Sequence, residues 1–203
     1  MNVADETVFV VDDDESLCSS LEWMLSAEGL TCETFRSGEA FLDRYKNDPG
    51  CLLLDVRMPG MGGLELQEEL KTRGLELPII FVSGHADVPI AVNAMRQGAM
   101  DVIEKPFDKR MLIDRILSAF ERDRSNREQR MVRASLEERM ELLTPREREV
   151  FAEIVKGLSN KEVAFELGLS ARTVEKHKER VLRKMRVGSP AELIRVATEH
   201  ALA

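Results

Sequence analysis

Apolar runs of four or five residues alternate with helix-like segments over residues 1–122. In the helix-like segments, apolar residues recur every three or four positions, as they do on one face of an α-helix. The runs expected to form strands are Thr7–Val11, Thr31–Phe35, Cys51–Leu54, Pro78–Val82 and Asp101–Glu104. The helices expected after them pass through Leu17, Leu21, Met24 and Leu25 and cover Glu39–Arg44, Leu64–Thr72, Pro89–Gln97 and Lys109–Arg122.

Five strand–helix pairs in succession predict an α/β domain built on a parallel sheet. Cys51–Leu54 shows no polar alternation, which is typical of a central strand buried on both faces. Right-handed crossovers would place helices on both sides of the sheet. We therefore expect a doubly wound (βα)5 fold with the flavodoxin-like strand order 2-1-3-4-5.

The pattern changes beyond residue 122. Residues 121–141 hold 12 charged positions of 21 and contain neither Pro nor Gly, which predicts a solvated helix or a flexible linker. We favour a helix that continues from the preceding one. After it, Gly168 separates two short helical segments, as in a helix-turn-helix. The predicted division is an α/β domain over residues 5–122, a charged helical linker over 123–141 and a small all-α domain over 142–203.

Three helix starts in the last part carry a capping-box pattern, in which a hydroxyl residue is followed three positions later by Glu. They are Thr144–Glu147, Ser159–Glu162 and Ser189–Glu192. Pro145 and Pro190 stand at the first helical position, where a missing backbone N–H costs nothing. The pattern predicts helices that begin at these residues.

Charge is divided unevenly along the chain. Residues 1–122 hold 12 basic and 23 acidic residues, whereas residues 123–203 hold 17 and 14. Arg172–Arg186 alone contains seven basic and two acidic residues. An acidic first part and a locally basic second part predict different partners, with nucleic acid for the second.

Other features of the composition narrow the class of protein. No apolar run approaches the length of a membrane span, and we expect no membrane partner. The N-terminal residues lack the basic region followed by an apolar stretch that is typical of a secretory signal. The three cysteines lack metal-ligand spacing and are expected to be reduced thiols. A cytoplasmic protein is therefore predicted.

Polar side chains follow the ends of the predicted strands. Asp12 and Asp13 follow the first strand, Asp55 the third, Ser83 the fourth, and Lys105 comes just after the fifth. Because the carboxyl ends of parallel strands meet at one edge, we expect these residues to share a rim. Such a cluster suits Mg²⁺, which prefers oxygen ligands, together with a phosphoryl group.

The chemistry expected at this rim is phosphoryl transfer to a carboxylate. The Asp55 carboxylate could attack phosphorus in line and form an aspartyl phosphate. Lys105 and Ser83 could contact the phosphoryl oxygens. Taken singly, each residue has an ordinary explanation, and we assign Asp14 to capping the first helix. The joint arrangement carries the hypothesis.

The first part resembles the receiver domain of bacterial response regulators. The resemblance rests on Val10-Val11-Asp12-Asp13, Asp55-x-x-Met58-Pro59-Gly60, Ser83-Gly84 and Lys105-Pro106-Phe107. It implies that Asp55 is the phosphoacceptor and that a sensor histidine kinase is the donor. It also implies that Mg²⁺ is bound by the side chains of Asp13 and Asp55, by the Arg57 carbonyl, and by Asp12 through water.

The same resemblance gives Ser83 the role of the switch hydroxyl and Lys105 that of the phosphate-contacting lysine. The Lys105–Pro106 bond is often cis in this family. The protein would not be an enzyme, beyond its own phosphorylation and autodephosphorylation at Asp55. One position departs from the family pattern, since Val102 stands where the family usually has its switch aromatic.

The last part closely resembles the LuxR-type four-helix DNA-binding module, on the residues Leu143–Val150, Leu158–Ala164 and Thr173–His177. With the receiver, the chain is similar to the FixJ group within the NarL/LuxR class of two-component response regulators. The resemblance implies that a helix from about Ala171 to Lys184 enters the major groove of promoter DNA. The implied base-facing residues are Glu175, Lys176 and Glu179, and the implied phosphate contacts are Lys161, Arg172, Thr173, Arg180 and Lys184.

Phosphorylation is expected to produce a homodimer that regulates transcription with RNA polymerase. The resemblance places the dimer surface on the fourth helix, fifth strand and fifth helix. The side chains expected there are Val88, Ile90, Val92, Met95, Met111 and Arg115.

Two other functions are considered. Asp12-x-Asp14 weakly resembles the phosphatases of the haloacid dehalogenase type, which also form an aspartyl phosphate, but this leaves the loop after Asp55 and the helical part unexplained. A pure interaction protein is the second alternative, in which the helical part binds another protein. A DNA-retardation assay separates that alternative from the preferred one.

Overall fold

The computed structural model describes residues 6–84 and 88–200. The chain falls into two compact units, Met1–Arg127 (unit 1) and Glu128–Ala203 (unit 2). Each unit has its own hydrophobic core, and they are described separately.

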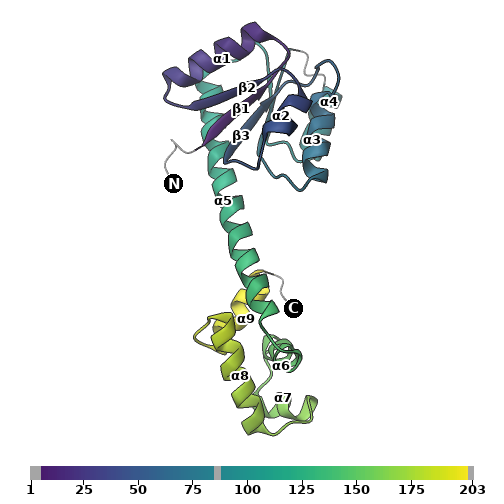
Figure 1. Cartoon of the computed structure of the whole chain (residues 1–203), viewed down its shortest axis with the longest axis vertical. Coiled ribbons are helices and arrows are strands. Elements are labelled where there is room, and N and C mark those ends of the chain that lie inside the picture. The colour runs from purple at the N-terminus through teal and green to yellow at the C-terminus, as the bar shows by residue number, and fades with distance from the viewer. Residues whose placement is uncertain (1–5, 85–87, 201–203) are drawn as a thin grey trace. The chain divides into compact units, whose positions relative to one another are not determined.

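Unit 1 is built on a five-stranded parallel sheet in the order β2-β1-β3-β4-β5 (Figure 1). The strands are β1 (Thr7–Val11), β2 (Thr31–Phe35), β3 (Gly50–Leu54), β4 (Ile79–Ser83) and β5 (Asp101–Glu104). Every observed strand lies within one residue of the predicted run. The doubly wound, flavodoxin-like order is therefore confirmed.

Helices cover both faces of this sheet, so unit 1 has three layers (Figure 1). One face packs against α1 (Glu15–Ala27) and the first part of α5 (Lys109–Glu141). The other face packs against α2 (Gly38–Arg44), α3 (Gly63–Thr72) and α4 (Val88–Arg96). Alternate residues of each strand serve the two faces, as the pleat requires.

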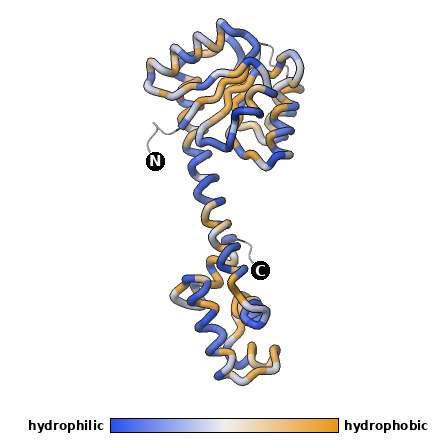
Figure 2. Tube along the Cα trace, in the orientation of Figure 1, coloured by the Kyte–Doolittle hydropathy of each residue, from blue (hydrophilic) through white to orange (hydrophobic). Residues whose placement is uncertain are grey.

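The core of unit 1 lies in these two interlayer regions. All five residues of β3 and all five of β4 are buried, which agrees with their continuous apolar sequences. Figure 2 shows the same contrast, with hydrophobic strands inside and hydrophilic positions on the outer faces of the helices. The buried sheet therefore holds the residues at the ends of its strands in fixed positions.

The helix α5 runs without interruption for 33 residues. The predicted linker is therefore helical, as favoured. The units divide within α5, after Arg127. Asp123 accepts hydrogen bonds from the Gly50 backbone N–H at 3.0 Å and from Arg127 Nε at 2.6 Å. Arg127 also donates to the Asn47 and Asp48 carbonyls, so the first linker residues belong to the fold of unit 1.

Unit 2 is all helical. Its helices are α6 (Pro145–Val155), α7 (Asn160–Glu166), α8 (Ala171–Met185) and α9 (Pro190–Glu199), which confirms the four-helix expectation. The main core includes Val150, Ile154, Val181 and Leu193, with Leu136 from α5. In the ranges 6–84 and 88–200, no helix is both long enough and apolar enough for a membrane span.

The helix starts of unit 2 match two of the three predicted capping boxes. Thr144 and Ser159 each form the complete reciprocal pair with the Glu three positions later. The prediction at Ser189 is wrong in one half. Ser189 Oγ accepts from the Glu192 backbone N–H, but the Glu192 carboxylate accepts from Gly188 N at 2.7 Å. The N-cap φ differs, at −152° for Ser189 against −67° for Thr144 and −71° for Ser159, and with this backbone the Glu192 carboxylate meets the N–H one residue earlier.

Candidate functional site

The register of the sheet brings the predicted rim residues to one edge. Val11 of β1 pairs with Leu54 of β3, so the next residues, Asp12 and Asp55, emerge side by side. The Asp55 N–H donates to the Val11 carbonyl at 2.9 Å, which ties the two strand ends together. Ser83 ends β4. The rim therefore arises directly from parallel pairing.

Lys105 joins the two carboxylates at this rim. Its Nζ donates to Asp12 Oδ2 at 2.7 Å and to Asp55 Oδ1 at 2.8 Å. Asp12 is 4% exposed and Asp55 is 8% exposed, whereas the Lys105 side chain is 23% exposed. Burial alone would lower the pKa of Lys105, but its hydrogen bonds to the two carboxylates outweigh this and raise the pKa. Lys105 thus carries a positive charge between two buried acids.

The remaining oxygens of the two carboxylates are fixed by backbone donors. Asp12 Oδ1 accepts from the Asp14 N–H at 2.9 Å. Asp55 Oδ2 accepts from the Arg57 N–H at 2.7 Å. Asp14 itself caps α1 by accepting from Ser16 and Leu17, so its assignment to capping is confirmed. Both rim carboxylates are held in one orientation before any ligand arrives.

Two further predicted residues lie beside this pair. Ser83 is buried, and its carbonyl accepts from the Lys105 N–H at 2.9 Å, which holds the lysine backbone against β4. Asp13 is exposed next to Asp12, and its carbonyl accepts from Arg36 at 2.6 Å. The structure therefore places buried Asp12, Asp55 and Ser83 with Lys105, and leaves Asp13 at the solvent side.

The donor chemistry of the rim fits Mg²⁺. Asp12 and Asp55 supply buried carboxylates, Asp13 supplies an accessible one, and Mg²⁺ needs only one or two because it keeps several waters. Among the described residues, no three acidic, His or Cys side chains already converge as a metal cage. A cation bound here would share the carboxylates with Lys105, because the ammonium contacts both.

Gly63, which the sequence reasoning did not single out, shapes the loop after β3. Its N–H donates to the Val56 carbonyl at 3.0 Å. A Cβ at this position would lie 2.2 Å from the Asp55 carbonyl oxygen and 3.0 Å from the Phe81 ring. Only glycine lets α3 begin this close to Asp55. The clue in the sequence is the pair Gly62-Gly63, which stands directly before the predicted helix Leu64–Thr72.

The segment around β5 shows the two features that the resemblance raised. The Lys105–Pro106 peptide bond is cis. Val102 is half-buried and packs against the core on the α2–α4 side of the sheet. A branched aliphatic side chain therefore fills the position where the family usually has an aromatic ring.

A second candidate surface lies on α8 in unit 2. Val174, Val181 and Met185 are buried along one side of the helix. The exposed charged residues of the helix are Arg172, Glu175, Lys176, Glu179, Arg180 and Arg183. Lys161, on the preceding α7, is also exposed. The helix thus combines an apolar side that anchors it with a charged, mainly basic side that is free to meet a ligand.

The turn between α7 and α8 is fixed by short-range contacts. Ser170 caps α8 by accepting from the Thr173 N–H, and the two hydroxyls lie 2.8 Å apart. Lys178 donates to Asn160 Oδ1 at 3.1 Å, a contact between the two helices that the sequence did not reveal. Val163 packs with Val174 beneath them. The two helices therefore form one rigid helix-turn-helix unit.

Lys184, predicted as a phosphate contact, is engaged inside unit 2. Its Nζ donates to Glu147 Oε2 at 2.6 Å and to the Leu142 carbonyl at 2.9 Å. The bond from Lys184, with those from Thr144, lowers the pKa of Glu147 to about 2. The Lys184 ammonium is thus engaged by the buried Glu147 and by the carbonyl of the exposed Leu142, and its bond to Glu147 joins α8 to α6.

Comparison with protein families matches both units. Residues 8–117 match the family model described as the response regulator receiver domain. Residues 141–197 match the model described as bacterial regulatory proteins, luxR family. Neither description is that of a phosphatase, so the haloacid dehalogenase alternative has no support.

Whole-chain relatives share this arrangement. The transcriptional regulatory protein FixJ of Azorhizobium caulinodans is 42% identical over 191 residues, which covers 94% of this chain and 90% of that protein. The structure of the response regulator StyR superposes with a TM-score of 0.83 at 38% identity, covering 96% of this chain and 99% of that one. Full-length FixJ from B. japonicum gives a TM-score of 0.59 at 37% identity, covering 98% of each chain.

Proposed function

Because the chain belongs to the FixJ-like bacterial response regulators, which join a receiver domain to a LuxR-type DNA-binding domain, we propose that phosphorylation of Asp55 controls its binding to promoter DNA. The phosphoryl donor is a sensor histidine kinase. A protein that receives phosphate from this kinase and binds promoter DNA acts in the cytoplasm.

The observation that carries this proposal is the pair of bonds from Lys105 to Asp12 and Asp55. The ammonium lies beside the Asp55 oxygen that would receive phosphorus. When Asp55 is phosphorylated, Lys105 can transfer its hydrogen bond to a phosphoryl oxygen without a large movement. Ser83, buried at the end of the adjacent strand, supplies a hydroxyl for a second phosphoryl oxygen.

The transfer step exchanges one bond to phosphorus for another. An Asp55 carboxylate oxygen attacks phosphorus in line while the bond from phosphorus to the kinase histidine nitrogen breaks. The electron pair of the broken bond stays on the imidazole nitrogen. Asp13 and Asp55, the Arg57 carbonyl and, through water, Asp12 would hold Mg²⁺, which offsets charge on the phosphoryl oxygens. Autodephosphorylation follows when water attacks the same phosphorus and releases the Asp55 carboxylate.

The switch that follows is a homodimer formed through α4, β5 and α5. In support, Val88, Val92, Met95 and Met111 expose apolar side chains on these helices. To shift the population of the dimerising state from 1:99 to 99:1, phosphorylation must stabilise that state over the other by about 5.5 kcal/mol. Val102 stands where the family usually has its switch aromatic, so no aromatic ring is available there to change position on phosphorylation. The conformational change therefore involves Ser83 and α4.

In the dimer, each α8 enters the major groove of one half-site. Glu175, Lys176 and Glu179 face the bases, and acidic side chains there favour the amino group of cytosine. Lys161, Arg172, Thr173, Arg180 and Lys184 contact phosphates. Half-sites about one helical turn apart fit such a dimer, which acts on transcription with RNA polymerase.

The test is to treat the whole chain with acetyl phosphate and Mg²⁺, locate the modification by mass spectrometry, and measure the mass in solution by light scattering. The wild-type chain is expected to carry phosphate on Asp55 and to dimerise. The Asp55→Asn variant is expected to do neither. Asp43→Asn, at an exposed position on α2, is the matched control and is expected to behave as wild type. Dimerisation of Asp55→Asn would refute the proposal.

A further inference from the structure

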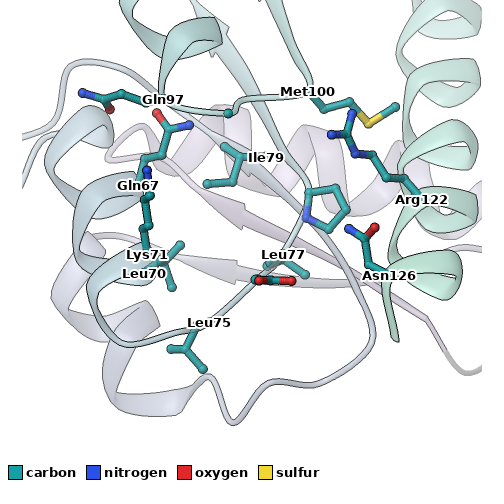
Figure 3. A pocket seen from close by; sticks show the side chains of 13 residues that line it. Gln67, Leu70, Lys71, Leu75, Leu77, Ile79, Gln97, Met100, Arg122 and Asn126 are labelled. Carbon is teal, nitrogen blue, oxygen red and sulfur yellow. The ribbon is translucent and has the colours of Figure 1, made fainter. Parts of the chain in front are cut away.

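A cavity of unit 1 lies at the amino-terminal ends of β4 and β5, at the other end of the strands from Asp55. It has a volume of about 200 Å³. Its lining includes Pro78 and Ile79 at the start of β4 and Met100 just before β5, whereas Asp55 and Ser83 stand at the carboxyl ends of their strands (Figure 3). The cavity is therefore separate from the phosphoacceptor rim.

Two buried amide oxygens line this cavity without a hydrogen-bond donor. Gln67, in α3, is 5% exposed, and its nitrogen donates to the Ala94 carbonyl of α4 at 3.3 Å. Its Oε1 has no partner among the described residues, and neither does Oε1 of Gln97. In Figure 3 the two glutamines lie on the same side of the cavity, across from Arg122 and Asn126. Buried acceptors are normally paired, so the site calls for a group that donates to both.

The rest of the lining is mixed, with an apolar wall, two basic side chains, the Glu76 carboxylate and the Asn126 amide. Leu70, Leu77 and Met100 form an apolar wall. Lys71 and Arg122 are exposed at its border and bring positive charge. A water occupies about 30 Å³ in the liquid, so the cavity has room for about six or seven waters or one small organic molecule.

We propose that this cavity binds a small organic anion that carries an N–H group on an apolar body. The N–H donates to the Gln67 and Gln97 oxygens, the apolar body lies on the apolar wall, and the anionic group meets Arg122, which stands across the cavity from the two glutamines (Figure 3). An N-acylated apolar amino acid is the simplest molecule with all three features. Pockets of this kind combine an apolar lining with a few convergent polar groups.

A ligand in this cavity would act on α4, because both glutamines that line it are connected to this helix. Gln67 already holds the Ala94 carbonyl, and Gln97 follows directly after the last residue of α4. A ligand bound to both amides would bias the position of this helix. This second part rests on the proposed function, in which α4 belongs to the surface that dimerises.

The binding test uses N-acetyl-L-leucine and the ¹H–¹⁵N NMR spectrum of the unphosphorylated full chain. We expect shifts at the Gln67 and Gln97 side-chain amides and at the Met100 backbone amide. The methyl ester of the probe lacks the anion, and 4-methylpentanoate lacks the N–H. Each should bind at least about tenfold more weakly, because each leaves part of the site unpaired. Equal shifts with all three compounds, or none at these residues, would overturn the proposal.

Variants assign the contacts. Gln67→Met keeps the size of the side chain but removes the acceptor, and Arg122→Met removes the cation. Both should weaken binding of N-acetyl-L-leucine by about tenfold or more. Arg110→Met, exposed and outside the lining, is the control and should bind as wild type. Undiminished binding by Arg122→Met would contradict the assignment even if Gln67→Met failed to fold.

A final measurement separates this proposal from the proposed function. The dimerisation constant after acetyl phosphate treatment is measured with and without N-acetyl-L-leucine. A change of about threefold or more in wild type, absent in Arg122→Met, supports coupling to α4. Binding with an unchanged constant would refute the coupling alone. A chain that never dimerises without the probe would refute the proposed function, while the NMR shifts still decide the site.

Discussion

Lys105 is the residue on which the candidate site depends most directly. It is the cation that contacts both buried rim carboxylates, Asp12 and Asp55. In Lys105→Met these acids would face each other without a positive charge. We expect a loss of about 2 kcal/mol in the free energy of unfolding, since removing one partner leaves buried charge uncompensated.

The same variant tests the metal assignment, because a cation bound by the carboxylates replaces part of the missing charge. Addition of MgCl₂ should therefore stabilise Lys105→Met more than wild type, as binding to the folded state alone shifts the equilibrium. Urea unfolding with and without MgCl₂ measures both effects. Equal stabilisation of the two chains by Mg²⁺ would count against a site at this rim.

Glu147 gives unit 2 a dependence on pH. Its pKa is lowered to about 2 from an ordinary value of 4.5. A carboxyl with a lowered pKa stabilises the fold above pH 4.5, and this contribution disappears as the pH falls towards 2. We expect Glu147→Gln to destabilise unit 2 by about 2 kcal/mol at neutral pH, allowing for the partial exposure of Lys184.

This difference between wild type and Glu147→Gln should shrink as the pH is lowered below 4.5. Amide hydrogen exchange in α6 and α8 of the whole chain reports the local stability. Glu149→Gln, at an exposed position in the same helix, is the control and should show little change. A gap that stayed constant from pH 7 to pH 3 would contradict the ion pair with Lys184.

Residue identities at the rim could be predicted from the sequence, but their pairings could not. Polar residues directly after apolar strands identified Asp12, Asp55 and Ser83, because a parallel sheet brings strand ends together. No pattern in the sequence indicated that Lys105 would bond to both acids. Lys184 was assigned to DNA from its position on the basic helix, and the sequence did not indicate that its ammonium also meets Glu147 of α6.

At the scale of elements, the start of α3 decides the geometry after β3. Gly63→Ala would push a Cβ to 2.2 Å from the Asp55 carbonyl oxygen. We expect a loss of stability of about 2 kcal/mol or more, as for other overpacked positions, together with slower phosphorylation. Gly62 has φ −70° and a Cβ there would lie 3.6 Å from its nearest neighbour, so Gly62→Ala is a matched control.

Thermal unfolding and the rate of phosphorylation by acetyl phosphate measure these two effects. If Gly63→Ala and Gly62→Ala behaved alike, the close approach of α3 to Asp55 would be of no importance to the site.

The DNA-facing helix α8 makes a second prediction at this scale. Lys176→Ala should weaken binding to the selected promoter sequence by about 1–3 kcal/mol, and binding to random duplex much less. Arg180→Ala should weaken both about equally and reduce the salt dependence by about one charge. Fluorescence anisotropy at several salt concentrations distinguishes the two. Arg195→Ala, on α9 and paired with Glu199, is the control.

Equal losses on both kinds of DNA would make Lys176 a phosphate contact. Binding of neither duplex by wild type would favour the alternative in which unit 2 binds a protein.

Most elements could be predicted because their signals are local. Runs such as Ile79–Val82 and the capping residues Thr144 and Ser159 depend only on near neighbours. The third capping box is incomplete, because the Glu192 carboxylate accepts from the Gly188 N–H and not from the Ser189 N–H that a capping box requires. That choice depends on backbone angles that the residue types do not specify.

At the scale of the molecule, the two units follow from changes of pattern and charge, whereas the boundary within α5 does not. Charged residues after position 122 indicated a solvated linker. Asp123 is nevertheless fully buried, and Arg127 pairs with it and with the loop at Asn47 and Asp48. Asp123 Oδ2 is paired with Arg127 and with the Gly50 N–H, which offsets part of the cost of burying the charge. Composition does not reveal such a pairing, and for this reason it predicted a solvated linker.

The central claim is that phosphate on Asp55 increases the affinity of this chain for promoter DNA. The most direct measurement is the dissociation constant for a duplex selected from a random pool, for wild type and Asp55→Asn, before and after treatment with acetyl phosphate and Mg²⁺. We predict that treatment tightens binding at least about tenfold in wild type and leaves Asp55→Asn unchanged. Equal affinities of treated and untreated wild type, or the same gain in Asp55→Asn, would contradict the account.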